Sequence, residues 1–387
     1  MDFGLSAERR AIQASVREWA ARELAPRAYD LDRDARFPAE LYQKCNRDLG
    51  VASIPFPDRY GGMGLGMLDM AIVIEELARV DQSFALTLMV SVAAGKMVDA
   101  FGTEPQKERF LPGIAAGTAI AAGAGTEPQA GSWTAGFKTR AERQGGEWVI
   151  TGEKAFITNC GTDITSVVAV CAVTSAPGAP THQMTMFLVP RGTPGMEVGA
   201  SYDKLGWRSS DTHPIYFDNV RLGDDALLGT LGQGRYILHK GYHNGRILIS
   251  ALAVGLAQGC LDHAIAYAKE REAFGRRIGG FQLVQKMVAD IAVKVETARL
   301  IARKAAWAYD SGTPDDYTMS ISKYYCAEIA SECADLAIQV HGGSGFMNES
   351  PPSRYWRDTR IVRIGDGTSQ IQVLLIAKAL GLDVDFG

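Results

Sequence analysis

The sequence has few of the residues that bind metals or cross-link a chain. Its 387 residues include 6 histidines and 6 cysteines, and the cysteines are scattered without a C-x-x-C pair. Because zinc sites and disulfide frameworks need clustered ligands or paired cysteines, we expect neither of them, and no metal of any kind. Cysteine usage of this sort is typical of a reducing compartment, so we expect a cytoplasmic protein.

Long runs of like charge and of hydrophobic residues are also missing. The chain carries 40 basic and 44 acidic residues, a net charge of −4, with no long basic run. This balance argues against nucleic acid and an anionic membrane surface as partners. The longest apolar stretch, residues 84–95, is shorter than the roughly 20 residues that span a bilayer. The N-terminal residues include acidic side chains, unlike a signal peptide. We therefore expect a soluble protein that acts on a small molecule.

The spacing of apolar residues divides the chain into three regions. Residues 1–118 follow helical spacing after a candidate helix cap at Ser6, and residues 119–230 follow strand spacing. Residues 231–387 return to helical spacing. The length suits more than one domain. We expect an α+β protein with a helical domain, a β domain and a second helical domain.

The predicted strands are short, and the predicted C-terminal helices are long. Short strands separated by Gly, Pro, Asn or Asp are typical of a small barrel or a sandwich. Long helices favour a bundle with oligomer contacts. The predicted strands are 147–150, 166–170, 184–189 and 215–217, and the predicted C-terminal helices are 232–270, 280–311, 315–341 and 368–380.

One acidic residue near the C-terminus stands between two glycines. Gly365 and Gly367 permit backbone conformations closed to other residues, so Asp366 can point into a cavity. Thr368 is well placed to cap the next helix, whose N-terminus suits an anionic group such as a phosphate. This arrangement indicates a cofactor site with a base. The alternative is that Asp366 is itself a helix cap in an ordinary turn between helices.

Eight motifs follow one another along nearly the whole chain. They occupy residues 75–81, 126–132, 152–157, 205–210, 271–275, 281–282, 339–343 and 366–370. With these motifs the chain resembles the acyl-CoA dehydrogenase family of flavoproteins. The resemblance implies an α-helical N-terminal domain, a middle β-barrel and a C-terminal four-helix bundle, assembled as a homotetramer with bound FAD.

The resemblance also implies roles for individual residues. Phe156 would pack on the flavin ring, Thr158 would bond its N5 edge, and Thr126 would meet its pyrimidine edge. The adenine half of FAD would be held by residues of a neighbouring subunit. The implied cofactor residues are Ala124, Thr126, Gly131, Ser132, Phe156, Ile157, Thr158, Arg271, Phe274, Gln282, Gln339, Gly342, Gly343, Thr368 and Gln370, and the implied substrate residues are Ser132, Arg246, Gly365 and Gly367.

The implied activity is FAD-dependent α,β-dehydrogenation of an acyl-CoA to the 2-enoyl-CoA, with an electron-transfer flavoprotein as acceptor. Removal of the α-proton needs a positioned base, and the family's usual Glu is replaced here by Asp366. The shorter side chain retracts the carboxylate by roughly 1.5 Å, which can cost on the order of a hundredfold in rate. Other members place the base just before the residue that matches Arg246, but here that position is Gly245.

The sequence leaves two alternative functions open. Nitroalkane oxidases of related sequence use an Asp at this position, but they place an Arg seven residues later, where this chain has Val373. A non-catalytic flavoprotein with a binding role, such as the DNA-associated relatives, is the other alternative. The sequence shows no basic patch for such a role.

Small residues near the expected acyl site predict the shape of the substrate. Gly365 stands where the family usually has Tyr, and Gly123 and Gly125 replace bulkier residues. The lost volume should widen the cavity for a branched, cyclic or aromatic acyl group, unless side chains of the β domain refill it. We expect structural roles for Glu127 and His341.

Overall fold

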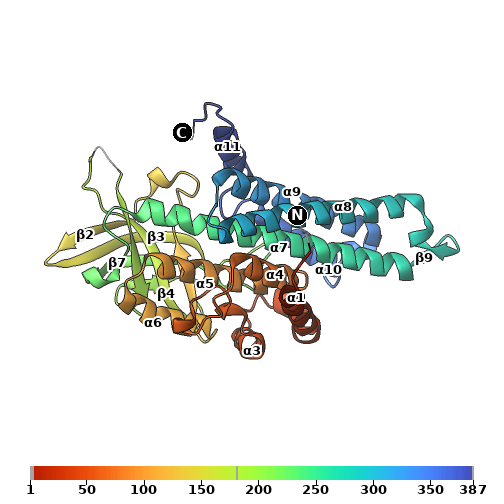
Figure 1. Cartoon of the computed structure of the whole chain (residues 1–387), viewed down its shortest axis with the longest axis horizontal. Helices are drawn as coiled ribbons and strands as arrows, with labels where there is room; N and C mark the ends of the chain where they lie inside the picture. The colour runs from red at the N-terminus through yellow and green to blue at the C-terminus, as the bar shows by residue number, and fades with distance from the viewer. Residues whose placement is uncertain (1–3, 180–181, 386–387) are drawn as a thin grey trace.

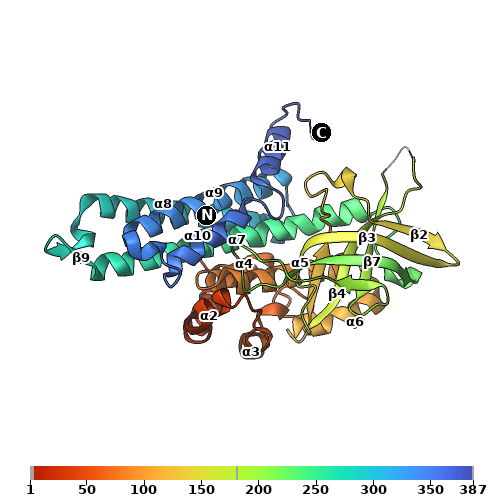
Figure 2. The ribbon, with the colours of Figure 1, turned by 180° about the vertical axis from the view of Figure 1, so that it is seen from behind.

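A computed structural model describes residues 4–179 and 182–385. Figures 1 and 2 show the sheet at one end of the molecule and a bundle of long helices extending from it, with the N-terminal helices packed along one side. The element type changes between residues 115 and 120 and again between residues 228 and 234.

Six α-helices make up the N-terminal part. Ser6 accepts a hydrogen bond from Arg9 N at 3.3 Å, which confirms the predicted cap of α1. Asp81 caps α5 by accepting from Phe84 N at 2.8 Å. Such caps satisfy backbone N–H groups that have no partner inside the helix. The helices are α1 (Ala7–Trp19), α2 (Ala28–Arg33), α3 (Ala39–Leu49), α4 (Met67–Ala78), α5 (Gln82–Phe101) and α6 (Glu104–Ala115).

The middle part is one eight-stranded sheet. Its pairing follows the path β6-β7-β3-β2-β4-β5-β8, and β1 pairs in parallel with β4. The four predicted strand runs lie on β3, β4, β5 and β7, and β3 continues beyond the predicted run as far as Thr158. The strands are β1 (Ile120–Ala124), β2 (Arg140–Gln144), β3 (Glu147–Thr158), β4 (Thr165–Val173), β5 (Met184–Pro190), β6 (Met196–Val198), β7 (Thr212–Leu222) and β8 (Leu227–Leu228).

Long helices form the C-terminal bundle. Helices α7, α8 and α9 pack against one another, and α10 and α11 pack on α9. Helix α10 was missing from the predicted segments, because it begins with Pro351 and Pro352, which are tolerated in a first helical turn but resemble a loop in sequence. The elements are α7 (Gly234–Glu270), β9 (Glu272–Ala273), β10 (Arg276–Arg277), α8 (Gln282–Asp310), α9 (Asp316–His341), α10 (Pro351–Val362) and α11 (Ser369–Ala379).

Two helices, α5 and α7, are long and apolar enough to cross a membrane by length and composition alone. Their most apolar windows are 67% and 83% buried inside the protein. Helix α7 packs on α4, α5, α8, α9 and α10. The apolar surface of both helices is therefore used in the core, where α7 connects the three parts of the chain.

Candidate functional site

A buried ion pair fixes the turn after β1 to strand β3. Lys154 on β3 donates to Glu127 Oε1 and to the carbonyl O of Gly125, both at 2.8 Å. The side chains of Lys154 and Glu127 are 0% and 1% exposed. Burial is the largest influence on Glu127 and would raise its pKa, but the charge and hydrogen bond of Lys154, together with hydrogen bonds from Lys138 and Thr139, outweigh burial and lower it. Ala155 N also donates to the carbonyl O of Thr126 at 2.9 Å, so Glu127 holds Thr126 beside the strand, a structural role as expected.

Phe156 projects from β3 with an unusual backbone conformation. Its φ is +61°, its side chain is 62% exposed, and its ring centroid lies 5.0 Å from that of Tyr202. A positive φ is rare for an aromatic residue and is typical of functional positions. The adjacent Ile157 is buried, and Thr158 pairs with Thr212 on β7. The strand therefore presents an open aromatic ring next to a fixed threonine.

The remaining residues predicted near the flavin ring lie on the turn after β1. Ala124 is the buried last residue of β1. The turn closes when Glu127 N donates to Ala130 O at 2.9 Å. Gly131 follows this turn, and Ser132 beyond it is exposed. The structure thus brings the turn and the end of β3 together, as predicted.

Asp366 lies in the link between α10 and α11 with φ +52°. Thr368 Oγ1 accepts from Ile371 N at 3.2 Å, so Thr368 is the N-cap of α11, as predicted. The alternative in which Asp366 caps this helix is wrong. A left-handed backbone at a residue other than glycine costs about 1–3 kcal/mol and persists only where the surroundings enforce it. Gln370 lies exposed in the first turn of α11.

The Asp366 carboxylate faces α7 at a position that has no side chain. A Cβ placed on Gly245 would lie 3.2 Å from Asp366 Oδ1 and 3.3 Å from its Cγ. The two positions that the resemblance implies for a base, Asp366 and Gly245, therefore lie next to each other in this fold. Burial raises the pKa of Asp366, while the charges of Lys323 on α9 and Arg246 on α7 oppose the rise. Within the described part of the chain, no hydrogen bond holds this carboxylate.

The glycines expected to widen the acyl site differ in what surrounds them. A Cβ on Gly125 would lie 3.3 Å from Leu238 Cδ1 and 3.7 Å from the Tyr242 hydroxyl. A Cβ on Gly123 would lie 3.6 Å from the Met97 methyl group. Helices α5 and α7, and not the β domain, therefore supply the side chains next to these two positions.

Gly365 is the more open of these positions. A Cβ placed there would meet, among described atoms within 4 Å, only the carbonyl O of Ile361 at 3.6 Å. The volume of the tyrosine that is usual in the family is therefore not refilled next to the Gly365 backbone. Gly367 is more crowded, since its Cβ would lie 2.5 Å from Gln372 Nε2.

Most of the predicted adenine-side residues lie at the other end of the bundle, but Thr368 and Gln370, which belong to the same predicted set, lie at the start of α11 beside Asp366. Arg271 directly follows α7, Phe274 is in the turn of the β9–β10 hairpin, and Gln282 begins α8. Figure 1 shows β9 at the opposite end of the molecule from β3. Arg246 and Arg271 are separated by about 25 residues, almost all helical, which corresponds to roughly 37 Å.

The end of α9 joins this distant group. The His341 ring stacks on Tyr267 of α7 with centroids 4.3 Å apart, and its Nδ1 lies 2.7 Å from Ala337 O. His341 therefore has a packing role, as expected. At Gly342 and Gly343 an added Cβ would meet no described atom within 4 Å. Gln339 precedes these bare backbone positions on α9. One chain thus forms two groups of predicted cofactor residues and does not bring them together.

A cluster of ionisable residues lies one turn of α7 before Arg246. His239, His243 and Asp316 could hold a metal ion by geometry, since their ligand atoms all lie within 4.8 Å of one another. However, Arg246 Nη1 lies 3.3 Å from the same Asp316 oxygen that His243 Nε2 approaches at 2.9 Å. The hydrogen bond from His243 lowers the pKa of Asp316 to about 2. Because a guanidinium already neutralises this carboxylate, we interpret the cluster as an ion-pair network that anchors Arg246.

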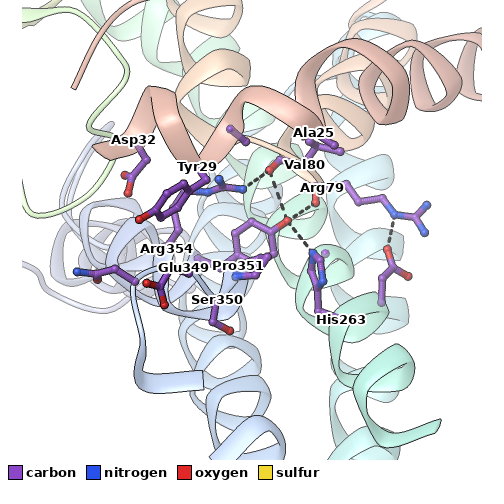
Figure 3. A pocket seen from close by; sticks show the side chains of 15 residues that line it. Ala25, Tyr29, Asp32, Arg79, Val80, His263, Glu349, Ser350, Pro351 and Arg354 are labelled. Carbon is purple, nitrogen blue, oxygen red and sulfur yellow. Dashed lines mark hydrogen bonds and ion pairs between the residues drawn. The ribbon is translucent and has the colours of Figure 1, made fainter. Parts of the chain in front are cut away.

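A hollow of about 220 Å³ lies elsewhere in the molecule, between α2, the end of α4, α7 and the start of α10. Figure 3 shows the side chains that line it. Tyr355 OH donates to Arg79 O at 2.8 Å, and Arg354 Nη2 donates to Val80 O at 2.7 Å. Burial lowers the pKa of His263 on its wall to about 4, which keeps this ring neutral. None of the predicted site residues lines the hollow. Its polar side chains connect α4 to α10 and have a structural role.

Comparisons with known proteins identify the class. The acyl-CoA dehydrogenase N-terminal domain matches residues 6–118, the middle domain residues 122–220 and the C-terminal domain residues 232–381. A probable acyl-CoA dehydrogenase of Bacillus subtilis, YngJ, is 39% identical, and the alignment covers 98% of this chain and 100% of the relative.

Solved structures agree with this match. Butyryl-CoA dehydrogenase of Megasphaera elsdenii has a TM-score of 0.94 and 32% identity, covering 98% of this chain and 100% of its own. A glutaryl-CoA dehydrogenase of Mycobacterium smegmatis in complex with FADH2 has a TM-score of 0.93 and 31% identity, and the match covers 99% of this chain and 97% of its own. A chain described with the electron transferring flavoprotein of Acidaminococcus fermentans has a TM-score of 0.95 and 35% identity, and the match covers 99% of this chain and 100% of its own.

The fold and the site define a flavin-dependent oxidoreductase. The chain belongs to the acyl-CoA dehydrogenase family, whose members use FAD to dehydrogenate acyl-CoA. The residues present fit this cofactor. Phe156 offers an open ring for stacking, Thr126 and Thr158 offer hydroxyl groups nearby, and Gly342 and Gly343 leave bare backbone for close approach of a phosphate.

Three residues of the site were not found from the sequence. Lys154 and Lys323 are both 0% exposed, and the Tyr242 hydroxyl would lie 3.7 Å from a Cβ on Gly125. Each lies in or next to a helical or strand pattern that explains it without any function. A lysine at an otherwise apolar helix position was the available signal for Lys323, because lysine is almost never fully buried unless it has a partner.

Proposed function

We propose that Asp366 is the base that removes the α-proton of the acyl-CoA thioester. The observation that carries this proposal is a carboxylate free of hydrogen bonds within the described chain, held at φ +52° and facing the bare backbone of Gly245. Burial raises its pKa, and a base with a pKa nearer to the working pH accepts a proton more readily. FAD, when bound, supplies the hydride acceptor.

Anaerobic reduction of bound flavin by acyl-CoA tests this assignment. Asp366→Asn keeps the shape of the side chain but removes the base, so we expect the reduction rate to fall about 10²- to 10⁴-fold. FAD content should stay the same, because the substitution leaves every implied cofactor residue unchanged. A matched Asp218→Asn substitution, on the exposed surface of β7, should reduce flavin at the original rate. Unchanged reduction in Asp366→Asn would show that the proton goes to another group.

We propose that a homotetramer completes each FAD site. The support is the separation of the two groups of cofactor residues within one chain. A surface for association is available on α8, where Val293, Leu300 and Trp307 are 64%, 50% and 58% exposed. Their spacing of seven residues places them on one face of the helix. Phe274, 96% exposed, would then stack on the FAD of another copy.

Light scattering with a simultaneous flavin count tests the assembly. We expect a tetramer with one FAD per chain, and we expect Leu300→Glu to lose both the tetramer and FAD. Asp218→Lys, which changes charge on the sheet instead, should lose neither. A monomer with full FAD content would contradict the proposal.

We propose a branched or ring-bearing acyl group as the substrate. Gly365 supports this, since the space of its missing side chain is bounded within 4 Å only by Ile361 O among described atoms. The test compares kcat/KM for butyryl-, octanoyl-, isobutyryl- and ring-bearing acyl-CoAs. Gly365→Tyr, allowed because this glycine has no positive φ, should shift the preference toward straight chains. A preference for butyryl-CoA in the unchanged enzyme would overturn the proposal.

We propose an electron-transfer flavoprotein as the electron acceptor and the cytoplasm as the location. The likeness to the chain described with the Acidaminococcus flavoprotein supports the acceptor, and the six free, buried cysteines support a reducing compartment. The acceptor is tested by mixing substrate-reduced enzyme with electron-transfer flavoprotein or with oxygen. Rapid peroxide formation without transfer to the flavoprotein would instead favour the oxidase alternative. Subcellular fractionation tests the location.

A further inference from the structure

The side chain of Lys323 is the most unusual buried group near Asp366. Lys323 lies in the second turn of α9 and is 0% exposed. Its Nζ has no hydrogen-bond partner among the described residues. A buried ammonium group without a partner carries a large desolvation cost. Burial lowers the pKa of Lys323 to about 8, and the largest opposing contribution comes from Asp366.

The other charges around Asp366 are already neutralised by partners. Arg246 on α7 is engaged with Asp316, which also binds His243. Glu328 on α9 is paired with Arg363 at 2.6 Å. Glu328 Oε1 also accepts a hydrogen bond from Ser369 Oγ at 2.7 Å, at the start of α11. Tyr242 on α7 is the remaining titratable neighbour, and burial raises its pKa, which keeps it neutral. Lys323 is therefore the nearby positive charge without a bonded counter-ion.

We propose that Lys323 is a positioning residue for the reaction, whose uncompensated charge keeps the Asp366 carboxylate ionised and ready to accept the substrate's α-proton. The inference rests on the proposed role of Asp366 as base. Desolvation alone would favour the protonated acid, which cannot accept a proton. Asp316, seven residues before Lys323 and on the same face of α9, contacts Arg246 of α7, so Lys323 lies on the side of α9 that packs toward α7. Its positive charge opposes the effect of desolvation on Asp366. Because Lys323 makes no hydrogen bond to the acid, the carboxylate oxygens stay free for the proton.

The dependence of flavin reduction on pH measures this effect. The acid limb of kcat/KM reports the pKa of the base in the free enzyme. In Lys323→Met the limb should move upward by about 1–3 pH units, the range for loss of one nearby opposite charge. Lys323→Gln should move it in the same direction, and Lys323→Arg should keep it near its original place. If both neutral variants keep the original limb, the proposal is wrong.

Lys204 offers a matched control. It is a partly buried lysine whose pKa burial lowers to about 8, but its Nζ donates to Ser210 Oγ and Thr212 Oγ1, both at 2.8 Å. Lys204→Met should leave the acid limb in place. A purely structural role for Lys323 predicts a different pattern, in which Lys323→Met changes the melting temperature and leaves the limb unchanged.

A readout that does not depend on turnover separates the two proposals. Infrared difference spectra follow protonation of Asp366 directly, with Asp366→Asn identifying its carboxylic acid band. In the FAD-bound enzyme without substrate, Lys323→Met should shift the appearance of this band to higher pH. If Asp366→Asn stays active but the band shifts, the base assignment fails and the electrostatic coupling stands. If Asp366→Asn is inactive and the band does not shift, the role of Lys323 fails alone.

Discussion

Replacement of Lys154 by Met should destabilise the β domain strongly, because it leaves a buried charge without its counter-ion. Glu127 is 1% exposed and Lys154 is 0% exposed at a separation of 2.8 Å. Removing one partner of such a pair costs about 3–5 kcal/mol. Glu127 would keep hydrogen bonds from Lys138 N at 2.6 Å and Thr139 N at 3.0 Å. We therefore expect the free energy of unfolding to fall by about 3 kcal/mol, near the lower end of this range.

Urea unfolding followed by circular dichroism measures this loss, and FAD content should fall with it because the pair fixes the turn that carries Thr126. The control is Arg221→Met, which breaks an ion pair with Glu147 whose side chains are 55% and 50% exposed. An exposed pair contributes roughly 0–1 kcal/mol. Adding Glu127→Gln to Lys154→Met should recover part of the loss. If Lys154→Met and Arg221→Met destabilise equally, the reasoning is refuted.

Two further predictions concern a helix cap and a histidine. Thr368→Ala should lower the free energy of unfolding by about 1 kcal/mol by removing the cap of α11, while Thr368→Ser should keep it; equal losses in urea unfolding would contradict the cap. The hydrogen bond to Asp211 raises the pKa of His213 above its ordinary value of about 6.5. The stabilisation that follows from this raised pKa is complete at pH values below the pKa of the unfolded state. It is lost as pH rises through the pKa of the folded state. The difference in free energy of unfolding between the unchanged protein and His213→Gln should therefore narrow from about pH 6 to about pH 8. A constant difference would argue against this role of His213.

Local patterns in the sequence predicted the elements that depend on local signals. The caps at Ser6 and Thr368, four strand runs and the long C-terminal helices all follow from turn residues and apolar spacing. Strands β1, β2, β6 and β8 were missed because they are short or lack an alternating pattern, and β1 is rich in alanine and glycine. Pairing with β4 makes it a strand, and this contact is invisible in the local sequence.

The residues of the candidate site likewise divide into those that local sequence signals predict and those whose role depends on packing between distant parts of the chain. Asp366 was found because two glycines flank it, and Phe156 because it belongs to a motif. Lys323 was missed because its importance depends on the packing of α9 against α7 and α11, which join parts of the chain that are distant in sequence. Gly245 appeared in the sequence as the lack of a second base, whereas the structure shows it as the space that the Asp366 carboxylate faces.

The two buried lysines near the site show how one pair of residue types can serve different ends. Lys154 bonds Glu127 and Gly125 O, so its charge is neutralised in place and neither group is free to change protonation without loss of the fold. Lys323 bonds no described group, and Asp366 likewise accepts no hydrogen bond from the described chain. Charge interactions act at longer range than hydrogen bonds, so Lys323 can favour the carboxylate without occupying its oxygens. A hydrogen-bonded pair of lysine and carboxylate stabilises the structure. A pair that interacts only through charge leaves the acid able to exchange a proton with substrate.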